Sequence, residues 1–102
     1  MSMSEKYKEI FRLKGMLEKA GVPFKWIVRD DAGGYQICYP VGGSACVCSV
    51  IEHRFSYGNK FDKLEIRGLM TEKEKALHED TVLGNLTAED VFSRISNHFV
   101  IG

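Results

Sequence analysis

The stretch FKWIVRDDAGGYQICYP, residues 24–40, decides the fold of this chain. Large apolar residues alternate with other residues over 24–29 and again over 35–40, a pattern typical of strands that bury one face. The residues that share the apolar face are Phe24, Trp26, Val28, Tyr35, Ile37 and Tyr39. The turn-forming residues DDAGG lie between the two runs, so the stretch predicts a β-hairpin that ends at Pro40.

Two further strand-like runs follow the hairpin, at residues 45–53 and 63–67. Because consecutive strands joined by turns pair antiparallel, the four runs predict a four-stranded meander. The segment before the hairpin, residues 4–20, carries apolar residues at the spacing of an amphipathic helix. Ser4 suits the N-cap of this helix, and Gly21 suits its C-terminal stop.

Two helix starts follow the sheet. The pattern TEKE at residues 71–74 is a capping box and predicts a short helix to about His78. The pattern TAED at residues 87–90 is a weaker box and predicts a helix to about Phe99, with Gly84 in the linker. The predicted fold is therefore α+β: an N-terminal helix, a four-stranded antiparallel meander, then a short and a longer C-terminal helix packed on one face of the sheet.

The length of 102 residues predicts a single domain, residues 1–102, with one modest core. No apolar run approaches the roughly 20 residues needed to span a bilayer, and the N-terminus lacks the apolar core of a signal peptide. Three cysteines, an odd number, suit free thiols in a reducing compartment better than a disulfide framework. We therefore expect a cytoplasmic protein with no membrane partner.

Charge is unevenly spread along the chain, although the net charge is zero. Residues 1–29 hold seven Lys/Arg against three Glu, and residues 30–102 hold seven against eleven acidic residues. Such runs are usually solvated faces, here of opposite sign. The alternative is a basic first helix that contacts phosphate or an acidic protein. A sequence pI near 6.8 argues against a dedicated nucleic-acid binder, whose pI typically exceeds about 9.

The second face of the predicted sheet is also apolar. If strand register holds, the residues that point away from the core are Ile27, Cys38, Cys46, Cys48 and Val50. An exposed apolar, sulfur-rich face favours self-association, such as a homodimer, or a protein partner.

The candidate site residues near the third strand give no clear catalytic or metal site. Cys46 and Cys48 lie about 7 Å apart along a strand, a spacing that suits tetrahedral zinc poorly, even with Cys38 and His53 as further ligands. No predicted group is placed to lower a thiol pKa. Glu52 and His53 are neighbours on a strand and so point to opposite faces. We expect no cofactor, no metal and no catalytic residue here.

The loop RFSYGNKF, residues 54–61, mixes aromatic and cationic side chains around a Gly-Asn turn. Arg54, Phe55, Tyr57 and Lys60 are the residues that could stack on bases or contact a protein. The simpler interpretation is that Phe55 and Phe61 fold back on the core edge and that the rest forms an ordinary turn.

The combination of EIFRLKGMLEKAGVPF, GGYQICYP, CSVIEHRFSYG, LEIRGLMTEKE and LGNLTAEDVFSRI resembles a family of short proteins encoded by phages and prophages of Gram-positive bacteria. The resemblance covers nearly the whole chain. It carries over no catalytic residue. It implies an intracellular protein that acts on a host or phage component.

The sequence favours a small non-enzymatic interaction protein that binds a protein partner or self-associates. The candidate partner-binding residues are Arg54, Phe55, Tyr57, Lys60, Cys46, Cys48, Glu52 and His53. One alternative is a nucleic-acid-associated accessory or regulatory protein that uses the first helix or the 54–61 loop. The other alternative is a small enzyme with a site near Cys48, Glu52 and His53.

Overall fold

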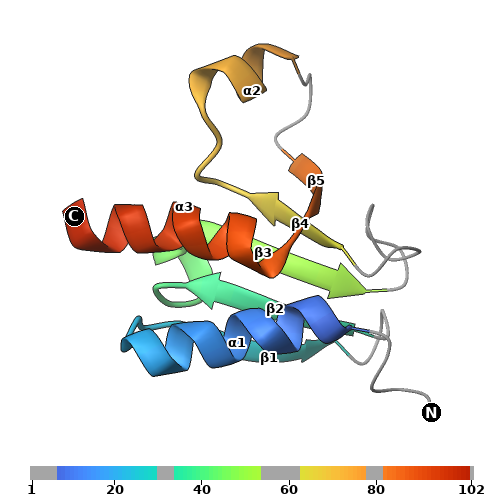
Figure 1. Ribbon diagram of the computed structural model, residues 1–102, viewed down its shortest axis with the longest axis vertical. Coiled ribbons are helices and arrows are strands. Elements are labelled where there is room, and N and C mark those ends of the chain that lie inside the picture. The colour runs from blue at the N-terminus through green and yellow to red at the C-terminus, as the bar shows by residue number, and fades with distance from the viewer. Residues whose placement is uncertain (1–6, 30–33, 54–62, 78–81, 102) are drawn as a thin grey trace.

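The computed structural model describes residues 7–29, 34–53, 63–77 and 82–101. These residues form three α-helices and one five-stranded antiparallel sheet with the strand order β1-β2-β3-β4-β5 (Figure 1). The strands are β1 Lys25–Arg29, β2 Gly34–Tyr39, β3 Cys48–His53, β4 Leu64–Arg67 and β5 Val82–Leu86. The helices are α1 Lys8–Ala20, α2 Glu72–Leu77 and α3 Ala88–Ile101, with a short 3-10 helix, η2, at Gly43–Ala45.

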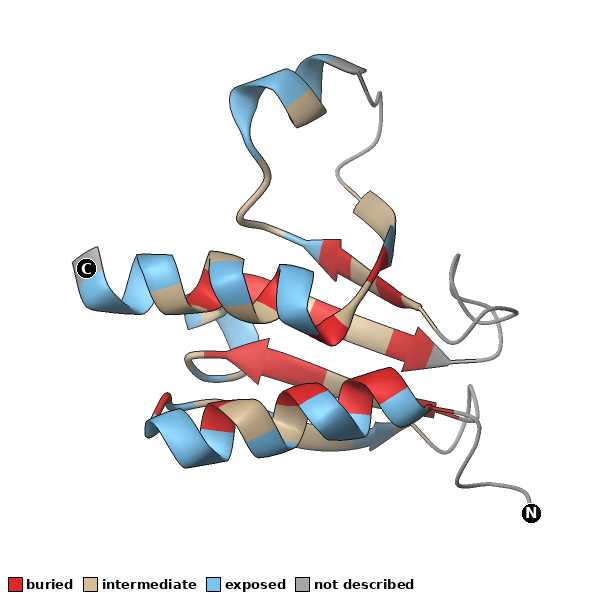
Figure 2. Cartoon of the chain, in the orientation of Figure 1, coloured by how far each residue is buried: buried red, intermediate tan, exposed pale blue. Residues whose placement is uncertain are grey.

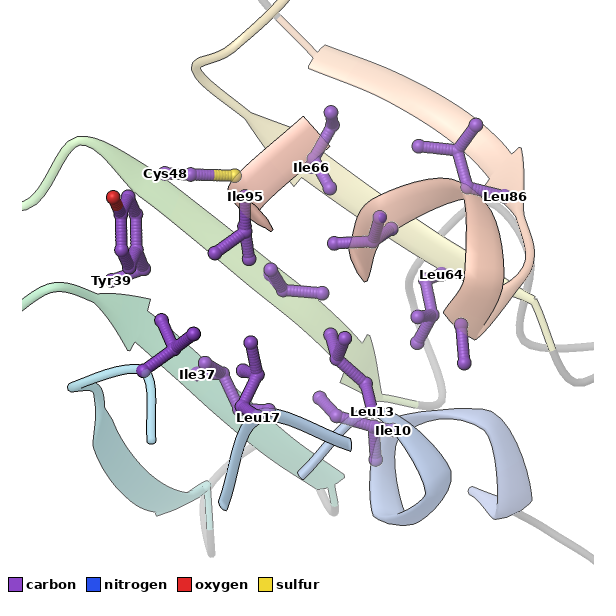
Figure 3. Packing of buried hydrophobic residues seen from close by; sticks show 14 of the residues in the cluster. Ile10, Leu13, Leu17, Ile37, Tyr39, Cys48, Leu64, Ile66, Leu86 and Ile95 are labelled. Atoms are coloured by element: carbon purple, nitrogen blue, oxygen red, sulfur yellow. The ribbon is translucent and has the colours of Figure 1, made fainter. Parts of the chain in front are cut away.

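The core lies between one face of the sheet and the two long helices, α1 and α3 (Figure 1). The buried residues line this layer (Figure 2), and aliphatic side chains from both helices meet those of the central strands there (Figure 3). The largest fully buried apolar side chains are Ile10, Leu13, Leu17, Ile37, Val50, Leu64, Ile66, Val91 and Ile95. Burial of each contributes about 1.5–3 kcal/mol, which makes this layer the main source of stability.

The first helix and the hairpin are confirmed within the described residues. α1 ends at the predicted glycine: Gly21 has a φ of 72° and donates its N–H to Glu18 O, and the next N–H bonds to Leu17 O at 3.0 Å. The described part of α1 begins at Lys8, and the predicted N-cap Ser4 lies outside the described residues. β1 and β2 pair antiparallel, with Trp26 opposite Ile37.

The prediction that Cys46, Cys48 and Val50 share an outward face is wrong. β3 begins at Cys48, so Cys46 precedes the strand. Register places Cys48 opposite Tyr39 and Val50 opposite Ile37, and opposite residues project to the same face. Both therefore turn into the core, where they are fully buried. The connection after β2 contains η2, and its length decides which side of β3 faces inward.

The sheet has a fifth strand that was predicted to be a linker around Gly84. β5 pairs antiparallel with β4, with Leu86 opposite Leu64, and runs directly into α3. Gly84 and Asn85 are poor strand formers, and Asn85 has a left-handed φ of 62°. The local sequence therefore does not predict this strand. α2 connects β4 to β5 and projects beyond that side of the sheet, so it does not pack on the helical face as predicted (Figure 1).

Both predicted capping boxes are confirmed. The N–H of Glu74 donates to Thr71 Oγ1 at 3.1 Å, and the N–H of Thr71 donates to Glu74 Oε1 at 2.9 Å. At α3 the N–H of Asp90 donates to Thr87 Oγ1, and the N–H of Thr87 donates to Asp90 Oδ2, both at 3.1 Å. Two of the orphan N–H groups at each helix end are thereby satisfied. Among the described helices, none has the length and apolarity to cross a membrane.

Candidate functional site

The three cysteines do not form the shared outer cluster that the sequence suggested. Cys48 points into the core, where its thiol donates to the carbonyl of Gly68 at 3.9 Å. Cys38 does face away from the helices, as predicted, opposite Ser49 in the ladder, but only 5% of it is exposed. Cys46 lies before β3 and is half-buried. All three thiols are free.

The chemistry of the two buried thiols is that of unreactive groups. Burial raises the pKa of Cys48 to about 12, with a smaller contribution from Cys46. Burial likewise raises the pKa of Cys38, and its neighbour Cys46 adds to the effect. Because a nucleophilic cysteine needs a lowered pKa, neither Cys38 nor Cys48 is prepared for catalysis. Within the described residues, no group of three or more His, Cys, Asp or Glu side chains is arranged to hold a metal ion.

Glu52 contributes to the packing of the fold. It is fully buried on the inner face of β3, and its Oε1 accepts a hydrogen bond of 3.2 Å from the N–H of Ile10 in the first turn of α1. A carboxylate at this position complements the positive end of the helix. Glu52 and Cys48 lie four residues apart on one strand, a separation of roughly 13 Å, so they do not meet at one site.

The remaining predicted site residues are less informative. His53 ends β3 opposite Gly34. Arg54, Phe55, Tyr57 and Lys60 lie outside the described residues. His98 on α3 forms a hydrogen bond of 2.8 Å with the hydroxyl of Tyr39, whose pKa is raised by burial.

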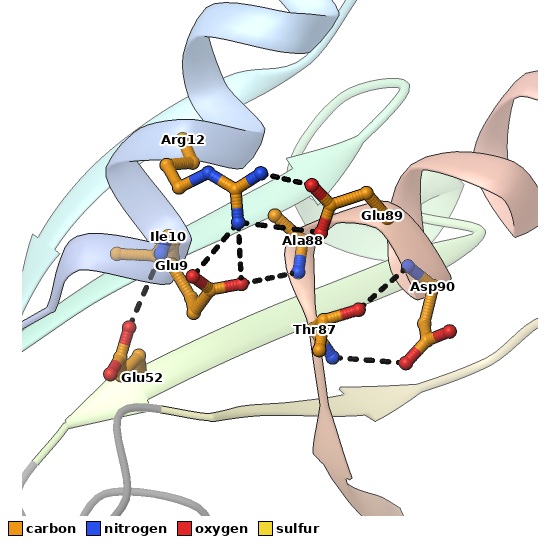
Figure 4. A network of polar contacts seen from close by, with 8 residues as sticks. All are labelled: Glu9, Ile10, Arg12, Glu52, Thr87, Ala88, Glu89 and Asp90. Atoms are coloured by element: carbon orange, nitrogen blue, oxygen red, sulfur yellow. Dashed lines mark hydrogen bonds and ion pairs between the residues drawn. The ribbon is translucent and has the colours of Figure 1, made fainter.

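A second polar network joins the two long helices (Figure 4). Glu9 of α1 accepts the N–H of Ala88, the first residue of α3, at 2.7 Å. Arg12 donates to both oxygens of Glu9 and also binds Glu89. The hydrogen bond from Arg12 lowers the pKa of Glu89. This network positions α3 against α1 and has the character of structural support.

Within the part of the chain that the structure describes, the most distinctive surface is an aromatic cluster where α1 meets the β1 side of the sheet. Trp26 and Tyr35 stack with their ring centroids 5.2 Å apart, and Phe11 lies 4.8 Å from the Tyr35 ring in an edge-on arrangement. The ammonium group of Lys14 lies 5.3 Å from the centre of the Trp26 ring. Phe11 is 48% exposed and Val28, opposite Tyr35 in the ladder, is 54% exposed. Large apolar groups thus reach solvent beside the first strand.

The same side of the molecule is basic. Residues 7–29, which form α1 and β1, hold six Lys/Arg and two Glu. On β1 itself, Lys25 and Arg29 alternate with the core-side residues and so lie on the face away from the helices. We call the set Phe11, Lys25, Trp26, Val28 and Arg29 the β1 edge surface.

Sequence reasoning did not identify this surface as a site. Alternation correctly assigned Trp26 and Val28 to the helix side, and the predicted meander makes β1 an edge strand. Alternation alone gave no indication that Phe11 and Val28 remain exposed there, because exposure depends on how α1 packs on the sheet. The uneven charge of residues 1–29 was the one local signal that pointed to it.

No family model, curated protein or solved structure matches this chain.

Proposed function

We propose that this protein is a non-enzymatic interaction module that binds a protein partner through the β1 edge surface. The observation that carries the proposal is the exposure of Phe11 and Val28 around the stacked pair of Trp26 and Tyr35. Aromatic residues that are partly open to solvent are enriched where proteins bind one another, and the ammonium group of Lys14 lies beside the Trp26 ring. The resemblance to phage and prophage proteins supports a partner from the host or the phage, met in the bacterial cytoplasm.

The sulfur-rich outer face no longer supports this function, because Cys48 and Val50 are buried. Other exposed apolar residues, Val41, Val47, Phe99 and Val100, lie on the connection after β2 and at the end of α3. They have no stacked aromatic pair beside them among the described contacts. The β1 edge surface is therefore the part of the described chain with the strongest character of an interface.

The test is capture of partners from a Gram-positive bacterial lysate on the tagged protein at low and moderate salt. Val28→Ser is the test variant and Val41→Ser is the matched control, since the two valines are 54% and 47% exposed. We expect one stoichiometric protein with the wild type and the control, and its loss with Val28→Ser. Equal capture by all three proteins contradicts the proposal. Nucleic acid recovered only at low salt would instead favour the nucleic-acid alternative.

A further inference from the structure

The two edges of the sheet differ in regularity. β1 pairs with β2 over five consecutive residue pairs without interruption, and no described element pairs with its other side. β5 at the opposite edge has a register shift against β4 and a left-handed Asn85. Bulges and irregular backbone discourage the addition of a further strand, whereas a straight edge presents unpaired N–H and C=O groups. Among the described strands, β1 is the edge suited to accept one.

The two faces of β1 set the chemistry of an added strand. Trp26 and Val28 project toward the helix side, next to the exposed ring of Phe11. Lys25 and Arg29 project to the opposite face, at the two ends of the strand, and Arg29 also donates a hydrogen bond of 2.9 Å to Gln36 of β2. A strand laid along β1 would therefore meet apolar groups at two central positions on one face and a cation at each end on the other face.

We propose that the β1 edge surface binds an extended acidic segment of its partner, which joins the sheet beside β1. The inference rests on the proposed function and names the class of ligand. Residues opposite one another share a face, so the matching segment has an acidic residue opposite Lys25 and another opposite Arg29. Apolar residues face Trp26 and Val28 between them. The pattern reads acidic, apolar, any, apolar, acidic, and it is the same in both strand directions.

Charge disfavours a second copy of the chain as the occupant. If two β1 strands paired antiparallel about Ile27, Lys25 of one copy would lie opposite Arg29 of the other. Like charges directly opposite one another destabilise a strand pair, and opposite charges stabilise it. The cations that oppose self-pairing are the groups that attract an acidic segment.

The experiment uses a blocked peptide, Ser-Glu-Val-Thr-Val-Glu-Ser, titrated into the full chain up to about 1 mM, a range that detects weak binding. Trp26 is the one tryptophan of the chain, so its emission reports on this surface directly. We expect a saturable change in emission, lost when alternate peptide N–H groups are methylated. The peptide with Lys in place of Glu should bind about tenfold more weakly, because two attractive pairs become repulsive.

Charge exchange on the protein provides the matched control. Lys25→Glu combined with Arg29→Glu should weaken binding of the acidic peptide about tenfold and restore binding of the lysine peptide. Arg67 is an exposed cation of β4 on the sheet face that also carries Lys25 and Arg29. Arg67→Glu should therefore leave both affinities unchanged. Circular dichroism establishes that each variant is folded. Equal binding of the two peptides, or no response to the acidic peptide, overturns the inference.

The outcomes separate this inference from the proposed function. Lysate capture that depends on Val28, together with an inert acidic peptide, overturns the acidic-segment inference and leaves the interaction surface standing. Capture that does not depend on Val28, together with an inert peptide, overturns both. A dimer in sedimentation that Val28→Ser converts to monomers overturns the inference in favour of a second copy.

Discussion

The carboxylate of Glu9 in α1 accepts the backbone N–H of Ala88 in α3 at 2.7 Å, across 79 positions of sequence. The first N–H groups of a helix have no partner within the helix, so this contact satisfies one of them from a neighbouring element. Glu52 of β3 does the same for Ile10 of α1 at 3.2 Å. The start of each long helix is thus held by a carboxylate from a different part of the fold (Figure 4).

Removal of the Glu9 carboxylate should destabilise the protein. We expect Glu9→Ala to lower the free energy of unfolding by about 2 kcal/mol, because a buried N–H loses its acceptor and Arg12 loses an ion pair. Glu9→Gln keeps an acceptor oxygen and should lose about half as much. Urea denaturation measures both values. Glu18→Ala, which removes an exposed ion pair with Lys14 in the same helix, should cost under about 0.5 kcal/mol. Equal losses at Glu9 and Glu18 would contradict the role of this contact.

Features set by neighbouring residues were predictable from the sequence, and features set by distant ones were not. The stop at Gly21 and the box at Thr71 depend on side chains within a few positions, and the structure has both. The inward side of β3 depends on the path of the connection after β2, which alternation within the strand does not contain. β5 forms because its backbone can pair with the edge of β4, although Gly84 and Asn85 locally favour a turn.

The candidate site follows the same division. The apolar face of residues 24–29 is visible in the sequence, but the exposure of Val28 depends on which strand ends the sheet. The sequence offered Glu52 as a candidate partner-binding residue beside His53. Its actual contact, the N–H of Ile10, lies 42 positions away and is created by tertiary packing alone.

Two glycines should respond in opposite ways to the same substitution. A Cβ at Gly15 would meet nothing within 4 Å, so Gly15→Ala should stabilise α1 by about 1 kcal/mol through helix propensity. Gly68 has a φ of 102°, and a Cβ there would lie 2.1 Å from Val47 O. Gly68→Ala should therefore destabilise by about 2 kcal/mol or more. Thermal and urea unfolding measure both effects, and a shift of the same sign at both positions would contradict the local geometry.

The ion pair between Glu74 and Arg94 should make the free energy of unfolding depend on pH in the acid range. Arg94 donates to both oxygens of Glu74, at 2.8 and 2.5 Å, and to Leu69 O at 3.0 Å. The hydrogen bond from Arg94 lowers the pKa of Glu74 from its ordinary 4.5 to about 2. A lowered pKa in the folded state means that the unfolded state takes up the proton first. This contribution is fully present above pH 4.5 and should disappear as the pH falls to about 2.

The Glu74→Gln variant isolates that contribution. Its melting temperature, followed by circular dichroism, should fall less steeply than that of the wild type over this acid range. At neutral pH the variant should be less stable by about 1 kcal/mol, because one charged partner of Arg94 is lost. Glu72→Gln serves as the control, since Glu72 forms only an exposed pair with Lys75 among the described contacts. Parallel acid profiles for Glu74→Gln and the wild type would contradict the assignment.

The three thiols should react with Ellman's reagent at very different rates. Labelling needs an accessible thiolate. Cys48 is fully buried with its pKa raised to about 12, and Cys38 is 5% exposed, whereas Cys46 is half-buried. We expect one rapid reaction in the native protein, lost in Cys46→Ser, and reaction of all three thiols in urea. Labelling of Cys48 should follow unfolding, because only opening of the core exposes it. A rapid phase that survives in Cys46→Ser and disappears when Cys48→Ser is added would contradict the inward register of β3.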